Sequence, residues 1–222
     1  MDVTFTEATN EAFPKCLELE SIQKKYNWEP GSLYNLGCGN NKLKGFLNID
    51  INSGCNPDKI IDFEIIPWDL PDNSADVILL YHVLEHLGET TKQFLSIIKE
   101  LYRISRHNST IWITVPYPLH SHFRHDPTHV RSVTPTTMSM FSQRNCDNYV
   151  QNNLPNTPLA HITGVDFEVL NWTYKWDNEA IRLYKNKGII KENEPLEQYA
   201  HTLNNLAEEL TMTIRVQKIV LH

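Results

Sequence analysis

Two glycines and an acid form the most informative pattern in this sequence. The residues Leu36-Gly37-Cys38-Gly39 close one apolar run, and a second apolar run ends at Asp50. Glycine lets the backbone approach a ligand closely or adopt a positive φ, and a carboxylate accepts hydrogen bonds from both hydroxyls of a ribose. The pattern therefore predicts a nucleoside-binding site at two neighbouring strand ends. An ordinary turn at a strand end is the alternative interpretation.

Histidines and a glutamate follow a later apolar run. The segment His82-Val83-Leu84-Glu85-His86 matches the inverted zinc-protease pattern, in which two histidines bind zinc and the glutamate acts as a base. Such a helix needs a third ligand and is not expected directly after a buried parallel strand. We therefore predict no metal site here, and a zinc hydrolase remains an alternative.

A second group of histidines lies in the segment 116–132, which we predict to be a long loop. Loops of this length in compact domains are usually functional or disordered, and the aromatic and histidine content favours function. Histidine titrates near neutral pH, alone or beside an aspartate, and so suits removal of a proton from a hydroxyl. The alternative is that Asp126-Pro127 forms a turn and the histidines hold the loop in place. The candidate catalytic residues are His82, His125, Asp126 and His129, and the candidate substrate contacts are Tyr117, His122, Arg124 and Arg131.

The order and spacing of these pieces resemble a known family. An LGCG turn at 36–39 and an HVLEHL segment at 82–87, with the acids and apolar runs between them, resemble class I S-adenosylmethionine-dependent methyltransferases of the type 11 group. The resemblance covers roughly residues 32–135, and the HDPTHVR segment at 125–131 extends it weakly. It implies S-adenosylmethionine as the cofactor and a Rossmann-like α/β fold. That fold has a mostly parallel sheet, helices on both faces and an antiparallel last strand.

The resemblance also implies roles for single residues. The backbone at Leu36, Gly37 and Gly39 would face the methionine half of the cofactor, and Asp50 would hold the ribose. Asp62 would lie near the adenine amino group, although a turn or a helix cap is the alternative for it. The full predicted cofactor set is Leu36, Gly37, Cys38, Gly39, Asp50, Ile51, Asp62 and His82.

Composition limits the class of protein. The 222 residues suit a single domain, and the net charge of -7 argues against non-specific binding of nucleic acid. The four cysteines have no Cys-x-x-Cys spacing, which indicates reduced thiols and a cytoplasmic location. The N-terminus has neither a signal peptide nor a membrane anchor, so no membrane partner is expected.

Hydrophobic patterning predicts the elements that position the site. We expect one methyltransferase domain over 1–222, with a leading helical cover within 1–31 and a substrate-side insertion over 116–163. A helix with apolar positions at 94–102 should begin at Thr90 or Thr91, and a short one over 132–141 should have Thr134 as its cap. Residues 142–163 read as exposed coil. Strands are predicted at 32–36, 46–51, 59–62, 76–80, 110–115, 166–174 and 212–221, and a charged helix near 194–210.

The acceptor of the methyl group is the least determined part. We expect an oxygen of a small molecule or of a sugar in glycan synthesis, given the acidic composition and the histidine-rich segment. A nucleobase or tRNA methyltransferase is one alternative, although its usual Asn/Asp-Pro-Pro-Tyr/Phe motif is absent from the sequence. A regulator that binds the cofactor without catalysis is another. The oligomeric state is left open.

Overall fold

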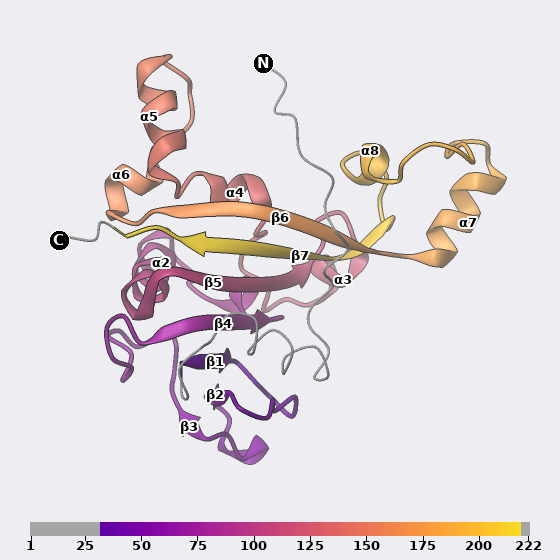
Figure 1. Ribbon diagram of the computed structural model, residues 1–222. Helices are drawn as coiled ribbons and strands as arrows, with labels where there is room; N and C mark the ends of the chain where they lie inside the picture. The colour runs from indigo at the N-terminus through magenta and orange to yellow at the C-terminus, as the bar shows by residue number, and fades with distance from the viewer. Residues whose placement is uncertain (1–31, 219–222) are drawn as a thin grey trace.

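The structure, a computed structural model, describes residues 32–218 and contains one seven-stranded sheet (Figure 1). The strand order is β3-β2-β1-β4-β5-β7-β6. The strands from β3 to β5 are parallel, and β7 runs antiparallel to both β5 and β6. This confirms the predicted mostly parallel, Rossmann-like sheet with an antiparallel last strand. The strands are β1 Leu33–Leu36, β2 Leu47–Asp50, β3 Lys59–Ile60, β4 Ala75–Tyr81, β5 Ser105–Pro116, β6 Phe167–Trp176 and β7 Ala207–Val216.

Continuous apolar runs form the central strands because both faces of the sheet are covered there. In β4, Val77 and Leu79 belong to a smaller core cluster, and Ile78 and Leu80 belong to a larger one. All four side chains are at most 1% exposed. Successive residues of a strand point to opposite faces, so the two clusters lie on the two faces of the sheet.

Helix α2, Thr91–Ile104, covers the face of the larger cluster, and it confirms the prediction for this segment. The Thr90 side chain caps the helix by accepting a hydrogen bond from the Gln93 amide. Its buried residues follow the three- and four-residue spacing of one helical stripe: Phe94, Ile97, Ile98, Leu101 and Ile104. The short helix α4, Pro135–Ser139, also begins as predicted, with Thr134 as its cap and Pro135 in its first turn.

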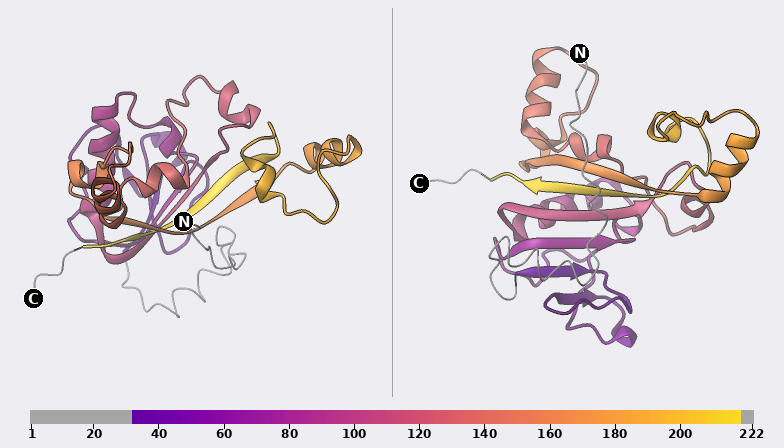
Figure 2. Two further views of the ribbon diagram at one scale, coloured as in Figure 1. Left: turned by 90° about the horizontal axis from the view of Figure 1, so that it is seen from above. Right: turned by 45° about the vertical axis from the view of Figure 1, so that its right-hand side comes forward.

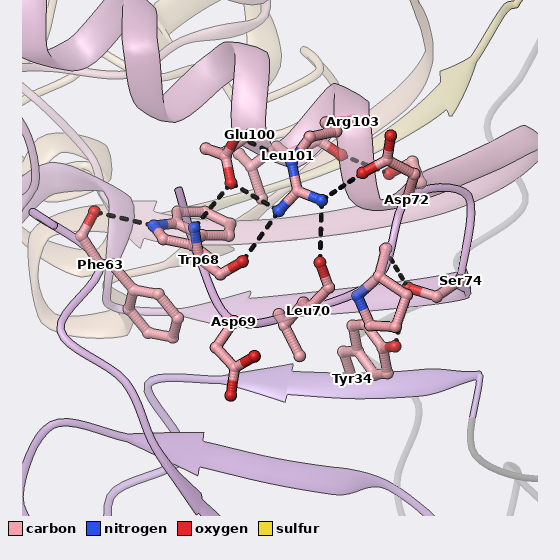
Figure 3. A network of polar contacts seen from close by, with 12 residues as sticks. Tyr34, Phe63, Trp68, Asp69, Leu70, Asp72, Ser74, Glu100, Leu101 and Arg103 are labelled. Atoms are coloured by element: carbon pink, nitrogen blue, oxygen red, sulfur yellow. Dashed lines mark hydrogen bonds and ion pairs between the residues drawn. The ribbon is translucent and has the colours of Figure 1, made fainter. Parts of the chain in front are cut away.

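A buried ion pair fastens the segment between β3 and β4 onto α2 (Figure 3). Glu100 Oε2 accepts hydrogen bonds from the Trp68 amide at 2.9 Å and from Arg103 Nη2 at 2.7 Å. Arg103 also donates to the carbonyls of Leu70 and Trp68, and its Nη1 lies 2.5 Å from Asp72 Oδ1. The hydrogen bond to Glu100 is the main cause that raises the pKa of Arg103. The chain that leads into β4 is therefore fixed through one charged pair.

Several predictions for the second half of the chain are wrong. The predicted loop at 116–132 contains a short helix, α3 Ser121–His125. The predicted coil at 142–163 contains α5 Gln143–Gln151 and α6 Leu159–Thr163. Helix α5 begins because the Ser142 side chain accepts from the Asn145 amide, and it buries Cys146 in the core. The polar composition of this segment led to the wrong prediction of coil. In α5 only the face that carries Cys146 packs against the fold, so its sequence is mostly polar.

The predicted helix near 194–210 is also wrong. Helix α8 covers only Glu197–Ala200, and β7 begins at Ala207. Pairing with β5 on one side and β6 on the other determines this stretch, because a central strand gains two hydrogen-bonded ladders. The last strand consequently begins five residues before the predicted start at 212. Helix α7, Asn178–Asn186, was not predicted, although Asp177 caps it clearly.

Two short 3-10 helices complete the described residues: η1 Ser53–Cys55 and η2 Leu84–His86. The predicted leading helix within 1–31 and the end of the predicted last strand at 219–222 lie outside these residues. None of the helices within 32–218 has the length and apolar character needed to cross a membrane.

Candidate cofactor and acceptor site

The site lies at the carboxyl edge of the sheet, where β1, β2 and β4 end. Figure 1 shows α3 beyond the end of β5 at this same edge, and the right-hand view of Figure 2 agrees. The strand order reverses between β1 and β4, since β2 and β3 extend the sheet to one side and β5 extends it to the other. Open α/β sheets bind ligands in the crevice outside such a reversal. The sequence-predicted glycine turn follows β1 and thus lies at this point.

The glycine turn is closed by backbone hydrogen bonds to the next strand. The amides of Gly37 and Cys38 both donate to the carbonyl of Ile49, at 2.8 and 3.0 Å. Gly37 has a φ of 69°, and a Cβ built on it would lie 2.3 Å from Val83 Cγ2. Glycine is required at this position because the segment after β4 packs directly against it. At Gly39 a Cβ would meet nothing within 4 Å, so that residue faces open space.

Asp50 connects the glycine turn to the end of β2. Its Oδ2 accepts a hydrogen bond from the Gly39 amide at 2.7 Å, and its Oδ1 accepts one from the Asn52 amide at 2.8 Å. The residue is half-buried. An ionised carboxylate has about four lone-pair positions, so both oxygens keep capacity for further donors. The arrangement can hold a ribose diol, and the role of Asp50 in doing so remains a prediction.

Further predicted cofactor residues lie in the glycine turn or shortly after β2 and β3. Cys38 is buried, and burial is the main cause that raises the pKa of its thiol to about 11. The thiol is therefore protonated at neutral pH and is neither a nucleophile nor a good metal ligand. Ile51 is 60% exposed. Asp62 lies two residues after β3 and accepts from the Glu64 amide at 2.9 Å, which is the turn that the alternative interpretation described.

The connection from β1 to β2 is a compact bend. The Asn41 amide donates to the Cys38 carbonyl at 2.8 Å. Within residues 37–46 the chain forms turns and no helix. A helix N-terminus therefore cannot hold the cofactor carboxylate at this connection.

His82 follows β4 directly and has a positive φ of 54°. Its Nδ1 lies 3.3 Å from Glu85 Oε1, and its Nε2 lies 3.5 Å from Glu209 Oε1. Burial opposes the charged form, but hydrogen bonds and the negative charges of Glu209 and Glu85 outweigh burial and raise the pKa of His82 to about 9. With these partners His82 carries a proton at pH 7.

Sequence reasoning missed Glu209 and its partner Lys175. Lys175 Nζ lies 3.0 Å from Glu209 Oε1, because these two residues are paired across β6 and β7. The hydrogen bond from His82 is the main cause that lowers the pKa of Glu209 to about 2. The opposite charges of Lys175 and Glu209 could have indicated a cross-strand pair, but only if the register of β6 against β7 were known.

The shifted carboxylate predicts a pH-dependent contribution to stability. Its pKa is lowered in the folded state, so Glu209 stabilises the fold fully above its unfolded pKa of about 4.3 and loses this effect as the pH falls toward about 2. We expect Glu209→Gln to reduce the free energy of unfolding by about 1–2 kcal/mol at pH 6. Urea unfolding should show a smaller difference from the unchanged chain at pH 3.

The control for that comparison is Glu192→Gln, which changes an exposed glutamate. This variant should match the unchanged chain at both pH values. Equal effects of Glu209→Gln at pH 6 and at pH 3 would contradict the assignment of a lowered pKa.

The predicted acceptor residues divide into exposed and engaged groups. His122, Arg124 and His125 are exposed on α3. Tyr117 is buried, and its hydroxyl lies 2.9 Å from His201 Nδ1. Asp126 accepts a hydrogen bond from the Thr128 amide, and His129 donates one to the Phe123 carbonyl. Arg131 donates to the Gly88 carbonyl, and its guanidinium stacks on the ring of Phe94.

These engaged side chains give the alternative interpretation of the loop some support. Asp126 forms the turn that Asp126-Pro127 suggested, and hydrogen bonds to Thr128 are the main cause that lowers its pKa. Burial lowers the pKa of Arg131, whose guanidinium packs within the fold. The catalytic and substrate roles assigned to these residues remain predictions.

The inverted zinc-protease pattern does not form its usual helix. That pattern places both histidines on one α-helical turn. Here only Leu84–His86 is helical, as a 3-10 turn, and His82 lies outside it. The geometry of a zinc hydrolase of this type is therefore not formed.

Comparison with known proteins agrees with this geometry. Residues 52–113 match the model of the methyltransferase domain family. This match and the sheet support a class I S-adenosylmethionine-dependent methyltransferase, with the sequence evidence confined to residues 52–113. The match likewise supports S-adenosylmethionine as the cofactor, as the resemblance in the sequence implied. The family match begins after β2, so the roles of the glycine turn and Asp50 in this methyltransferase rest on their geometry.

The fold recurs in a solved structure at low sequence identity, and a second structure is similar over most of its length. A S-adenosylmethionine-dependent methyltransferase of Archaeoglobus fulgidus is 15% identical, with a TM-score of 0.51 and alignment over 90% of this chain and 94% of that one. A putative methyltransferase of Bacillus halodurans is 9% identical, with a TM-score of 0.49 over 91% and 100% of the two chains. No protein of curated function matches the sequence significantly.

Proposed function

We propose that this methyltransferase transfers the methyl group to a hydroxyl oxygen of a small polar acceptor of the sugar class. The observation that carries this proposal is a groove of about 750 Å³ along β6. Among its lining residues are Tyr117, Trp172, Tyr174, Arg144, Asn145 and Asp166.

The chemistry of this groove suits a polyhydroxylated ligand. Trp172 and Tyr174 lie two residues apart on β6, so both side chains are on one face of the strand. The ring of Tyr117 meets that of Tyr174 edge to face, with centroids 5.4 Å apart. Aromatic rings cover the apolar face of a sugar, and the neighbouring amide, carboxylate and guanidinium groups match its hydroxyls.

One end of the groove lies on the side of the sheet where we propose that the cofactor binds. Tyr117 directly follows the end of β5, which is parallel to β1 and β4. That end of the groove therefore lies toward the carboxyl edge, where the glycine turn and Asp50 are found. Holding an acceptor in line with a reacting carbon supplies roughly 7–11 kcal/mol of the barrier in favourable cases.

The residues at the carboxyl edge fit the cofactor. Leu36, Gly37 and Gly39 offer backbone next to open space, and Asp50 keeps acceptor capacity for a ribose diol. S-adenosylmethionine supplies a methyl group on a positively charged sulfur. The acceptor oxygen forms the new bond to the methyl carbon as the carbon–sulfur bond breaks, the electron pair stays on sulfur, and the hydroxyl proton leaves to a base or to water. His125, Asp126 and His129 are the proposed candidates for proton removal, and His82, which already carries a proton, is the proposed candidate for positioning the acceptor.

Transfer of a labelled methyl group to a panel of acceptors tests the proposal. We expect label in sugars or sugar nucleotides and none in tRNA, consistent with the net charge of -7. Trp172→Ala should raise the KM for the acceptor at least about tenfold without changing cofactor affinity, because aromatic side chains dominate such sites. Leu170→Ala is the matched control, since Leu170 lies on the same strand and does not line the groove.

Transfer to tRNA alone, or an unchanged KM in Trp172→Ala, would contradict the proposed acceptor class. Cofactor binding without transfer to any acceptor would favour a regulator. The proposal assumes a cytoplasmic enzyme, and the free thiols of Cys38, Cys55 and Cys146 support that assumption.

A further inference from the structure

We propose that Glu85, His86 and His129 form a binding site for a divalent transition metal ion of the zinc class. One ligating atom of each residue lies within 4.8 Å of the other two. The residues come from two separate segments, η2 and the chain after α3. The Val130 amide joins these segments by donating to the Glu85 carbonyl at 2.9 Å.

The two histidine rings are oriented as metal ligands usually are. His129 Nδ1 lies 2.7 Å from the Phe123 carbonyl, which can only accept, so Nδ1 carries the hydrogen. The Thr128 hydroxyl donates to Asp126 Oδ1 at 2.6 Å, so the hydroxyl oxygen accepts from His86 Nδ1 at 2.8 Å. In both rings Nε2 is then the nitrogen that remains for a metal. A histidine ligand that donates its second N–H to an oxygen is the common arrangement around protein-bound metals.

Glu85 supplies the third ligand. Its buried carboxyl group is also a second, independent observation that points to a bound cation. Its side chain is fully buried, and its Oε2 has no hydrogen-bond partner among the described residues. An ionised oxygen without a partner in the interior is costly, and a cation removes that cost. His86 Nε2 lies 4.0 Å from Glu85 Oε1, which is too long for a hydrogen bond.

The distances suit a metal after small rotations. Ligand atoms around a zinc ion, each at about 2.0–2.2 Å from it, lie roughly 3.4 Å apart. Side-chain movements of about 1 Å therefore bring the three atoms into range. His86 is 33% exposed and provides the entrance, while His129 is 7% exposed. Two imidazoles and one carboxylate leave at least one coordination position for another ligand.

This site differs from the zinc-protease pattern and from the sequence prediction of no metal. His82 belongs to the pattern but is not in the cluster, and His129 lies more than forty residues after His86. The proposal also gives His129 the role of a ligand in place of the proton-accepting role predicted from sequence.

Metal binding by the full chain tests this proposal. After treatment with chelator, the chain should bind one Zn²⁺ in equilibrium dialysis, and Co²⁺ should give a visible ligand-field absorption that Zn²⁺ abolishes. We expect His86→Ala and His129→Ala each to weaken Zn²⁺ binding at least about tenfold. Thr128→Val should also weaken it, since that change removes the acceptor for His86 Nδ1 without removing a ligand.

His161→Ala is the control, because His161 pairs with Asp147 on α5, away from the cluster. This variant should bind Zn²⁺ as the unchanged chain does. Zn²⁺ should also raise the unfolding temperature of the unchanged chain but not that of His86→Ala. Absence of saturable binding, or binding that His86→Ala or His129→Ala retains unchanged, overturns the proposal. Neither readout requires methyl transfer, so failure here is distinguishable from failure of the proposed acceptor.

Discussion

Replacing Glu100 by alanine should destabilise the protein by about 1–3 kcal/mol, because it leaves the Trp68 amide without its acceptor and removes the main partner of the half-buried Arg103 guanidinium. Glu100 is 6% exposed, and it also accepts the Trp68 amide. The substitution thus removes the acceptor of one buried amide and the main partner of one half-buried cation (Figure 3). Urea unfolding at pH 7 measures the change, which should appear as a large shift of the midpoint.

The neighbouring Lys99 offers a matched control on the same helix. It is exposed, so Lys99→Ala should change the free energy of unfolding by no more than about 0.5 kcal/mol. A double variant, Glu100→Leu with Arg103→Met, should be more stable than Glu100→Ala alone, since it removes both charges together. A loss below about 1 kcal/mol in Glu100→Ala would show that the pair does not hold the segment before β4.

Replacing Asp50 by alanine should weaken S-adenosylmethionine binding at least tenfold. Each hydrogen bond from a ribose hydroxyl to a charged carboxylate contributes about 1.5–3 kcal/mol, and about 1.4 kcal/mol corresponds to a factor of ten. The structure adds a second reason, because Asp50 also accepts from the Gly39 amide and so holds the glycine turn in place. Titration calorimetry with S-adenosylmethionine and with S-adenosylhomocysteine measures the effect.

Two further variants separate these reasons. Asp50→Asn keeps an oxygen for the Gly39 amide but loses the charge. Its affinity for S-adenosylmethionine should therefore lie between that of the unchanged chain and that of Asp50→Ala. Asp69→Ala is the control, because Asp69 is an exposed acid with a 92% exposed side chain. Unchanged affinity in Asp50→Ala would remove Asp50 from the cofactor site.

Local patterns in the sequence were sufficient for the elements that depend on near neighbours. The helical stripe of α2 and its Thr90 cap involve residues within a few turns of one another, and both were predicted. The continuous apolar runs of β1 and β4 indicated strands buried on both faces, and therefore a parallel sheet. The glycine turn and Asp50 were found for the same reason, since each directly follows a strand.

Elements that depend on distant partners could not be predicted in this way. The stretch 207–210 was predicted as the end of a charged helix, yet it belongs to β7 because β5 and β6 pair with it. The helix α5 has a mostly polar sequence, and its buried Cys146 has a place only once the core exists.

The sequence by itself determined the class of this protein, because the glycine turn, the acid after β2 and the segment after β4 each consist of adjacent residues with a fixed chemistry. Only the tertiary structure decided which side chains share a charge or a ligand. The partners of His82 come from η2 and β7, and the cluster of Glu85, His86 and His129 comes from two segments. Ion pairs and metal–ligand bonds depend on the distance between atoms in space, and the separation of residues along the chain does not determine that distance.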